Sequence, residues 1–178
     1  MKDSKKTPKD SSINRRSFVS NTTKTAAGAA ALSALPIERF AHAAISPGDT
    51  IKIGLVGCGG RGTGAAVQAL STGESVKLVA MADVFRDKLD NRLEIISKQK
   101  EKQVDVKEDS KFVGPDAYKK VIEQVDLVIL TTPPGFRPYH FEEAIKQGKH
   151  VFMEKPVAVD GPGVRKVLEV AKIADQKG

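Results

Sequence analysis

The sequence of 178 residues predicts an α/β fold in which helices cover both faces of a parallel sheet. Two observations support this prediction. Short β-branched runs alternate with stretches of helical character beyond residue 49, which is the order of βαβ units. The first run, Ile51–Val56, is apolar nearly throughout, as expected for a strand that is buried on both faces. The sequence therefore indicates one doubly wound domain.

The first half of this domain contains three predicted strands. A helix at about Gly62–Leu70 leads to a second apolar strand, Val76–Ala82, and the polar stretch Phe85–Lys102 predicts a long helix. Residues Gln103–Lys111 are charged and show no periodicity, so we expect a surface loop there. A short third strand is predicted at Phe112–Val113.

The second half repeats the same alternation. Pro115 can open a helix at Asp116–Glu123, because proline is tolerated in a first helical turn. The sequence Asp126–Leu130 predicts the fourth strand, and a helix near Tyr139–Gln147 is expected to end at Gly148. The last strand and the last helix are predicted at 150–153 and 162–176.

The composition excludes several classes of protein. Apolar residues make up 40% of the chain and charged residues 29%, as in soluble globular proteins. The net charge of +7 arises mainly in residues 1–43, which carry eight Lys or Arg and three acidic residues. The chain has no Trp and two Tyr, so little aromatic surface exists for stacking nucleic-acid bases. The single cysteine, Cys58, excludes an internal disulfide.

Residues 1–43 are predicted to be an export signal that precedes the folded domain, residues 44–178. The segment 14–20, Asn-Arg-Arg-Ser-Phe-Val-Ser, resembles the twin-arginine signal. An apolar run at 26–35 follows it and is too short to form a stable membrane span. Cleavage is predicted after Ala43. We therefore expect recognition by the twin-arginine export machinery and a periplasmic or secreted location.

A glycine-rich turn between the first strand and the first helix matches G-x-G-x-x-G. Gly57 permits the tight turn, Gly59 lets a pyrophosphate approach the backbone, and Gly62 lets strand and helix pack closely. The helix N-terminus then offers free amides and a positive dipole to the pyrophosphate. This pattern predicts a Rossmann-type dinucleotide site, with Cys58, Gly60 and Arg61 completing the turn.

Asp83 lies 21 residues beyond Gly62, at the end of the second strand, where a carboxylate binds the adenosine ribose. A carboxylate repels a 2′-phosphate and so favours NAD, although Arg61 or Arg86 nearby leaves NADP open. The alternative is a plain turn followed by a helix-capping Asp. The three histidines are scattered, so no metal site is expected.

Four segments of the chain resemble the Gfo/Idh/MocA oxidoreductases, the group of glucose–fructose oxidoreductase and inositol dehydrogenase. They are Ile53–Gly62, Thr131–Pro134, His140 and Gly148–Pro156, and the resemblance covers residues 50–178. The most specific of them is Glu-Lys-Pro at the end of the last strand, residues 154–156. The resemblance implies a Rossmann domain that binds NAD or NADP.

The resemblance also implies roles for single residues. In this family the lysine of Glu-Lys-Pro lies beside the nicotinamide and the reacting hydroxyl, which makes Lys155 the expected acid–base residue. The alternative is a solvated surface lysine. Glu154 and Pro156 are expected to border the cofactor, with a cis Lys155–Pro156 bond. His140 either lies near the nicotinamide ribose or simply begins a helix. The loop over the cofactor is expected to comprise Thr131, Thr132, Pro133 and Pro134.

Members of this family continue into a second α+β domain that contacts the substrate and usually forms the oligomer interface. That domain is expected to be absent from these 178 residues, which would make the chain a fragment of a homo-oligomeric enzyme that retains cofactor binding. The expected function is an exported NAD(P)-dependent oxidoreductase for a sugar, a polyol or a related carbohydrate. Two alternatives remain: a glycoside hydrolase that works by oxidation and elimination with a retained NAD, and a non-catalytic NAD-binding protein. Such hydrolases tend to depart from Glu-Lys-Pro.

Overall fold

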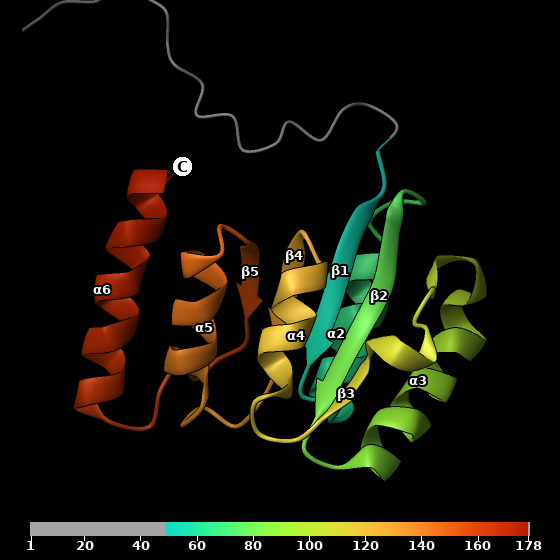
Figure 1. The fold of residues 1–178 in the computed structure, drawn as a ribbon, viewed down its shortest axis with the longest axis horizontal. Helices are drawn as coiled ribbons and strands as arrows, with labels where there is room; N and C mark the ends of the chain where they lie inside the picture. Colours follow the sequence, from blue (N-terminus) through green and yellow to red (C-terminus); the bar gives the residue numbers. More distant parts are fainter. Residues whose placement is uncertain (1–48, 178) are drawn as a thin grey trace, which may run out of the picture. The chain divides into compact units, whose positions relative to one another are not determined.

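A five-stranded parallel sheet forms the centre of the computed structural model, which describes residues 49–177. The strands lie in the order β3-β2-β1-β4-β5 (Figure 1). Within the described range, four α-helices and two short 3₁₀ helices connect the strands, and a fifth α-helix follows the last strand. The strands are β1 (Ile51–Val56), β2 (Val76–Asp83), β3 (Lys111–Val113), β4 (Leu127–Leu130) and β5 (His150–Met153). The helices are α2 (Gly60–Leu70), α3 (Arg86–Lys100), η1 (Glu101–Gln103), η2 (Glu108–Ser110), α4 (Ala117–Gln124), α5 (Arg137–Lys146) and α6 (Gly161–Lys177).

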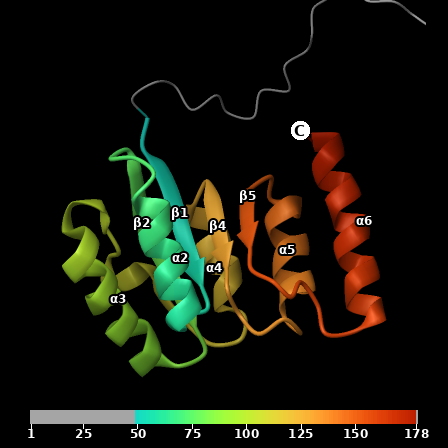
Figure 2. The same cartoon turned by 180° about the vertical axis from the view of Figure 1, so that it is seen from behind.

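Helices cover both faces of the sheet, so the predicted doubly wound α/β class is confirmed. On one face, α4, α5 and α6 contribute Val121, Ala144 and Val167 to an apolar cluster with the inward side chains of β4. On the other face, α2 and α3 contribute Leu70 and Leu89 to a second cluster. The two opposite views show α4 and α5 before the sheet in Figure 1 and α2 before it in Figure 2. The apolar character of β1 follows from this arrangement, because both faces of β1 are covered.

The order of the strands fixes where a ligand can bind. The chain moves from β1 outward to β2 and β3, then returns to the other side of β1 to form β4 and β5. The loops that leave the carboxyl ends of β1 and β4 therefore diverge to opposite faces of the sheet. The crevice between such loops is the position where doubly wound sheets bind their ligands.

The prediction of a surface loop at 103–111 is wrong in part. Residues 101–103 and 108–110 form the helices η1 and η2, and Val104 makes a parallel bridge with Leu78 of β2. The side-chain amide of Gln103 donates hydrogen bonds to the carbonyl oxygens of Leu70, Gly73 and Val76, at 2.7, 2.7 and 3.0 Å. A few long-range contacts therefore order this charged segment, and local periodicity does not report such contacts.

Some sequence-based predictions concern residues that the structure does not describe. The twin-arginine motif, the apolar run and the cleavage site all fall within residues 1–43, outside the described range of 49–177. Between residues 49 and 177, none of the helices combines the length and the apolar character needed to cross a membrane.

Candidate functional site

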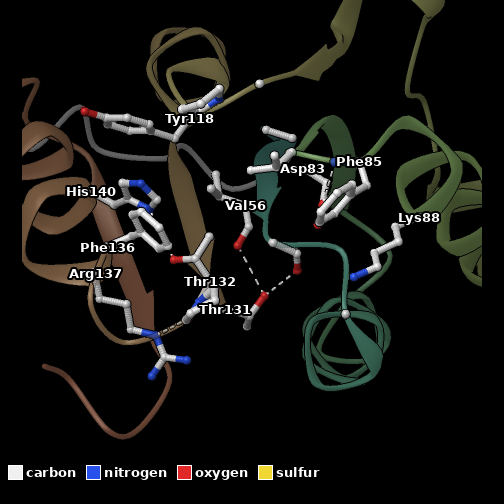
Figure 3. Close-up of a pocket in the computed structure, with 17 residues that line it drawn as sticks. Val56, Asp83, Phe85, Lys88, Tyr118, Thr131, Thr132, Phe136, Arg137 and His140 are labelled. Atoms are coloured by element: carbon white, nitrogen blue, oxygen red, sulfur yellow. Dashed lines mark hydrogen bonds between the residues drawn. The ribbon is translucent and has the colours of Figure 1, made fainter. Parts of the chain in front are cut away.

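A cavity of about 660 Å³ opens at the carboxyl ends of β1, β2 and β4 (Figure 3). Aromatic and aliphatic side chains form most of its wall, with a few polar groups among them, as is usual for cofactor sites. Among the described residues, no group of three His, Cys, Asp or Glu side chains is arranged to bind a metal ion. Seven of the predicted site residues line the cavity: Gly57, Gly59, Asp83, Thr131, Thr132, Pro133 and His140.

The three glycines of the motif lie in different surroundings. Gly57 has a φ of +95°, and a Cβ there would lie 2.7 Å from the amide nitrogen of Thr132. A Cβ on Gly62 would overlap the carbonyl oxygen of Gly57 and lie 2.5 Å from Thr131 Oγ1. A Cβ on Gly59, by contrast, would have no protein atom within 4 Å. Gly57 and Gly62 are thus required by the fold, whereas Gly59 leaves free space at the cavity.

The N-terminus of α2 faces this space without a side-chain cap. Gly59 is the N-cap residue, and within the described chain no side chain caps it. Its carbonyl oxygen accepts the first helical bond, from the amide of Thr63 at 3.0 Å. The amides of the first helical turn precede that bond and have no partner within the helix, which is the arrangement that binds phosphate groups at helix N-termini.

Asp83 links the end of β2 to the glycine turn. Its Oδ2 accepts a hydrogen bond from the Cys58 amide at 2.6 Å, and its Oδ1 accepts one from the Phe85 amide at 3.0 Å. Each carboxylate oxygen can accept a further bond, so Asp83 retains acceptors for a hydroxyl pair in the cavity. Cys58 itself is fully buried beneath the turn and does not line the cavity. Burial and the nearby Asp83 both raise the pKa of its thiol.

The two arginines near the predicted ribose site are held by carboxylates. Arg61 forms an ion pair with Glu154, and this hydrogen bond lowers the pKa of the Glu154 carboxyl. Arg86 pairs with Asp90 at 2.8 Å and with Glu108. Both guanidinium groups are therefore engaged by side chains of the protein, and Asp83 is the charged group at the end of β2 that faces the cavity.

An aromatic wall closes the opposite side of the cavity. The buried His140 ring stacks on Tyr118 with 4.0 Å between the ring centroids, and Phe136 lies beside it (Figure 3). The Nδ1 atom of His140 lies 3.2 Å from Thr132 Oγ1. Burial lowers the pKa of His140 to about 4. The imidazole is therefore neutral at pH 7, and its hydrogen bond connects α5 to the loop after β4.

The depressed pKa of His140 predicts a loss of stability in acid. The unfolded chain takes up a proton near pH 6.5, whereas the folded chain resists protonation until about pH 4, so stability falls as the pH drops through this window. Between pH 7 and pH 4.5 this group removes about 2 kcal/mol from the free energy of unfolding. Urea titrations at both pH values should show that His140→Gln reduces the pH dependence by this amount. An unchanged pH dependence in His140→Gln would contradict this account.

The Glu-Lys-Pro segment lies at the same edge of the sheet but outside the cavity. Glu154 is buried, and the Lys155–Pro156 peptide bond is cis, as expected. Lys155 is exposed and is the second residue after the end of β5. The predicted residues that do not line the cavity are Cys58, Gly60, Arg61, Gly62, Pro134, Glu154, Lys155 and Pro156.

Several residues that the sequence analysis did not select also contribute to the site. Phe85 and Lys88 line the cavity near Asp83, with the Lys88 ammonium 4.6 Å from the centre of the Phe85 ring. Tyr118 and Phe136 line the aromatic wall, and Arg137 lies at its base. Their nearness to predicted site residues in the sequence was the available signal, because Phe85 follows Asp83 closely and both Phe136 and Arg137 follow the loop after β4.

Comparisons with known proteins agree with this geometry. Residues 51–178 match the model of the oxidoreductase family GFO_IDH_MocA, described as an NAD-binding Rossmann fold. A glycosyl hydrolase family 109 protein of Solibacter usitatus is 31% identical over 124 residues, which are 68% of this chain and 27% of that protein.

Two solved structures resemble the domain closely. Scyllo-inositol dehydrogenase from Lactobacillus casei, solved with NAD(H) and scyllo-inositol, is 27% identical with a TM-score of 0.55, over 72% of this chain and 34% of that one. The WlbA dehydrogenase from Bordetella pertussis, solved with NADH and UDP-GlcNAcA, is 25% identical with a TM-score of 0.55, over 74% and 34%. The chain thus spans about a third or less of the length of these relatives. Its fold, its glycine turn and the match over residues 51–178 together show that the chain belongs to the Gfo/Idh/MocA family of NAD-binding oxidoreductases.

Proposed function

We propose that this chain is the cofactor-binding part of an exported NAD-dependent oxidoreductase that acts on a sugar or a polyol. The observation that carries the proposal is the cavity between the uncapped N-terminus of α2 and Asp83. In a dinucleotide the anionic diphosphate binds to a free helix N-terminus, and the hydroxyls of the adjacent ribose bind to a carboxylate. The carbohydrate substrate is inferred from the structures of relatives bound to scyllo-inositol and to UDP-GlcNAcA. Export is inferred from the twin-arginine pattern alone.

The residues present fit a dinucleotide. The space beside Gly59 accommodates the diphosphate against the free amides of α2, and Asp83 accepts the adenosine ribose hydroxyls. Phe85 offers an exposed ring next to Asp83 on which the adenine can lie. The loop that contains Thr131 and Thr132 covers the nicotinamide half. These assignments leave the aromatic wall beside His140 for the nicotinamide ribose.

When bound, a nicotinamide would supply the acceptor for a hydride from the carbinol carbon of the substrate. Lys155 lies beyond the carboxyl end of β5, and its side-chain amine, in the neutral form, accepts the proton of the substrate hydroxyl. Glu154 is paired with Arg61 and stays ionised, so it holds the turn rather than exchanging protons. Neutral His140 orients Thr132 through its hydrogen bond. The aromatic wall limits the access of water to the nicotinamide half of the cavity.

Cofactor preference provides the first test of this function. In calorimetry on the folded, nucleotide-free chain, NAD⁺ should bind at least roughly tenfold more tightly than NADP⁺, because Asp83 repels a 2′-phosphate. Asp83→Asn should weaken NAD⁺ binding by about tenfold and bring the two affinities close together, since it removes this charge. The exposed Asp87 on α3 provides a matched control, and Asp87→Asn should preserve the preference. Failure of the parent chain to bind either cofactor would exclude the proposed function.

A second function is supported by the likeness to glycosyl hydrolase family 109 proteins, one of which is 31% identical. In that case a retained NAD would be reduced and reoxidised within each catalytic cycle, and the products would be sugars. Incubation of the protein with NAD⁺ and scyllo-inositol, the ligand of one structural relative, should accumulate NADH if the protein is a dehydrogenase. A relative in Shewanella oneidensis, 27% identical over 127 residues, is an alpha-N-acetylgalactosaminidase. Release of nitrophenol from nitrophenyl N-acetyl-α-galactosaminide without net NADH would therefore indicate the hydrolase. Cofactor binding without turnover in either assay would favour a non-catalytic protein.

A further inference from the structure

Arg137 is a buried cation whose hydrogen bonds go to the main chain. It is the first residue of α5 and is 6% exposed. Its Nε donates to the carbonyl oxygen of Thr132 at 2.7 Å. Its Nη1 donates to the carbonyl oxygen of Pro156 at 2.5 Å and to that of Glu154. Among the described residues, it forms no ion pair with a carboxylate, although the charge of Glu154 is near enough to act on it.

The acceptors of Arg137 belong to two loops that leave neighbouring strands. Thr132 lies in the loop after β4, which lines the cavity, whereas Glu154 and Pro156 lie in the turn after β5. The two acceptors in the turn flank Lys155 on either side. One planar guanidinium therefore fixes the backbone on both sides of Lys155 relative to the wall of the cavity. Figure 3 shows Arg137 beside Thr132, at the lower left of the view.

Burying the charged guanidinium of Arg137 costs free energy, and hydrogen bonds must compensate for this cost. Burial lowers the pKa of Arg137, because the cation loses its hydration. Carbonyl oxygens compensate through charge-assisted hydrogen bonds, and the rigid fork of a guanidinium can serve several at fixed angles. A lysine has a single ammonium centre and cannot bridge two separate loops in the same way. The geometry thus suits the fork of an arginine better than the single ammonium of a lysine.

We propose that Arg137 is a positioning residue, which holds the turn with Lys155 in register with the loop over the cofactor. This inference rests on the proposed function, since it requires that Lys155 faces a nicotinamide. Arg137 would make no contact with the reacting atoms. It would act on them through the backbone on either side of Lys155, so its loss should uncouple Lys155 from the cofactor while leaving the diphosphate site intact.

The test uses the response of Lys155 itself to the cofactor, which needs no identified substrate. Lysines of the full chain are dimethylated with ¹³C-formaldehyde, and the Lys155 methyl resonance is assigned by its absence in Lys155→Arg. In the parent chain, saturating NAD⁺ should shift this resonance. In Arg137→Lys, measured at an NAD⁺ concentration that calorimetry shows to be saturating for this variant, the shift should fall to less than about half. Arg165→Lys, on the exposed side of α6, is the matched control and should behave as the parent.

The outcomes separate the two proposals. An unchanged Lys155 shift in Arg137→Lys would overturn the positioning role and leave the proposed function standing. If the parent chain binds no NAD⁺, or if its Lys155 resonance does not shift when NAD⁺ binds, both the proposed function and the positioning role are overturned. If Arg137→Lys does not fold, Arg137→Gln replaces it, because an amide keeps two donors without a buried charge. The same loss of the Lys155 response is expected, and its persistence would overturn the role.

Discussion

Replacing Gly59 by valine should lower the affinity for NAD⁺ by roughly a hundredfold while leaving the fold unchanged. The backbone of Gly59 has φ −87° and ψ −179°, an extended conformation that valine adopts without strain. A Cβ there meets no protein atom within 4 Å, so the new side chain fills only the space next to the free amides of α2. A diphosphate requires that same space. Calorimetry with NAD⁺ and thermal unfolding of the apo chain measure the two effects separately.

The matched control for this prediction is Gly73, in the turn before β2. A Cβ on Gly73 would meet only Ser75 Oγ, at an ordinary 3.8 Å, and Gly73 does not line the cavity. Gly73→Ala should therefore keep both the affinity and the melting temperature. If Gly59→Val bound NAD⁺ as tightly as the parent chain, the diphosphate would have to lie elsewhere, and the assignment of the α2 N-terminus would be wrong.

Replacing Gly62 by alanine should instead destabilise the fold itself, by about 3 kcal/mol or more. The added Cβ would overlap the Gly57 carbonyl oxygen and lie 2.5 Å from Thr131 Oγ1, which itself donates to that carbonyl at 2.6 Å. The Gly57 carbonyl belongs to the glycine turn, and the Thr131 hydroxyl belongs to the loop after β4. Because the two are hydrogen-bonded to each other, neither can move without displacing the other. The free energy of unfolding from urea titration measures the loss.

At Gly64, two residues further along α2, replacement by alanine should stabilise the fold rather than destabilise it. A Cβ there would meet only Arg61 Nη1, at 3.6 Å. Gly64→Ala should stabilise the chain by about 0.5–1 kcal/mol, because alanine favours the interior of a helix. If Gly62→Ala and Gly64→Ala had effects of the same sign, the close contact at Gly62 would not control stability.

Much of the fold could be predicted from the sequence because its central strands, β1, β2 and β4, are largely buried. The bounds of β1 agree with the prediction at both ends, because its last four residues are buried under α2 and α4, which favours an apolar run. The structure of segment 103–111 could not be predicted from the sequence, because the side-chain amide of Gln103 orders it through hydrogen bonds to carbonyl oxygens about thirty residues away. Contacts over such distances leave no periodic trace in the sequence.

The site was predictable to the extent that its groups belong to motifs. Two glycines of the turn, Gly57 and Gly59, line one cavity together with Asp83 and the loop from Thr131 to Pro133. Arg137 was not predicted, because its partners are backbone carbonyls, and any sequence can provide those. The role of Lys155 stays a prediction, because its side chain is exposed and its place depends on a bound cofactor and on substrate-binding elements.

The burial of Cys58 has a chemical consequence for a protein proposed to work in an oxidising compartment. Cys58 is the only cysteine of the chain, its sulfur donates to the Ala82 carbonyl at 3.4 Å, and its surface is fully covered. Thiolates, not thiols, react with disulfides and peroxides, and the raised pKa of Cys58 keeps it in the thiol form. The turn is thereby protected from mixed disulfides and sulfenic acid, and the folded protein should tolerate oxidants without cross-linking into dimers.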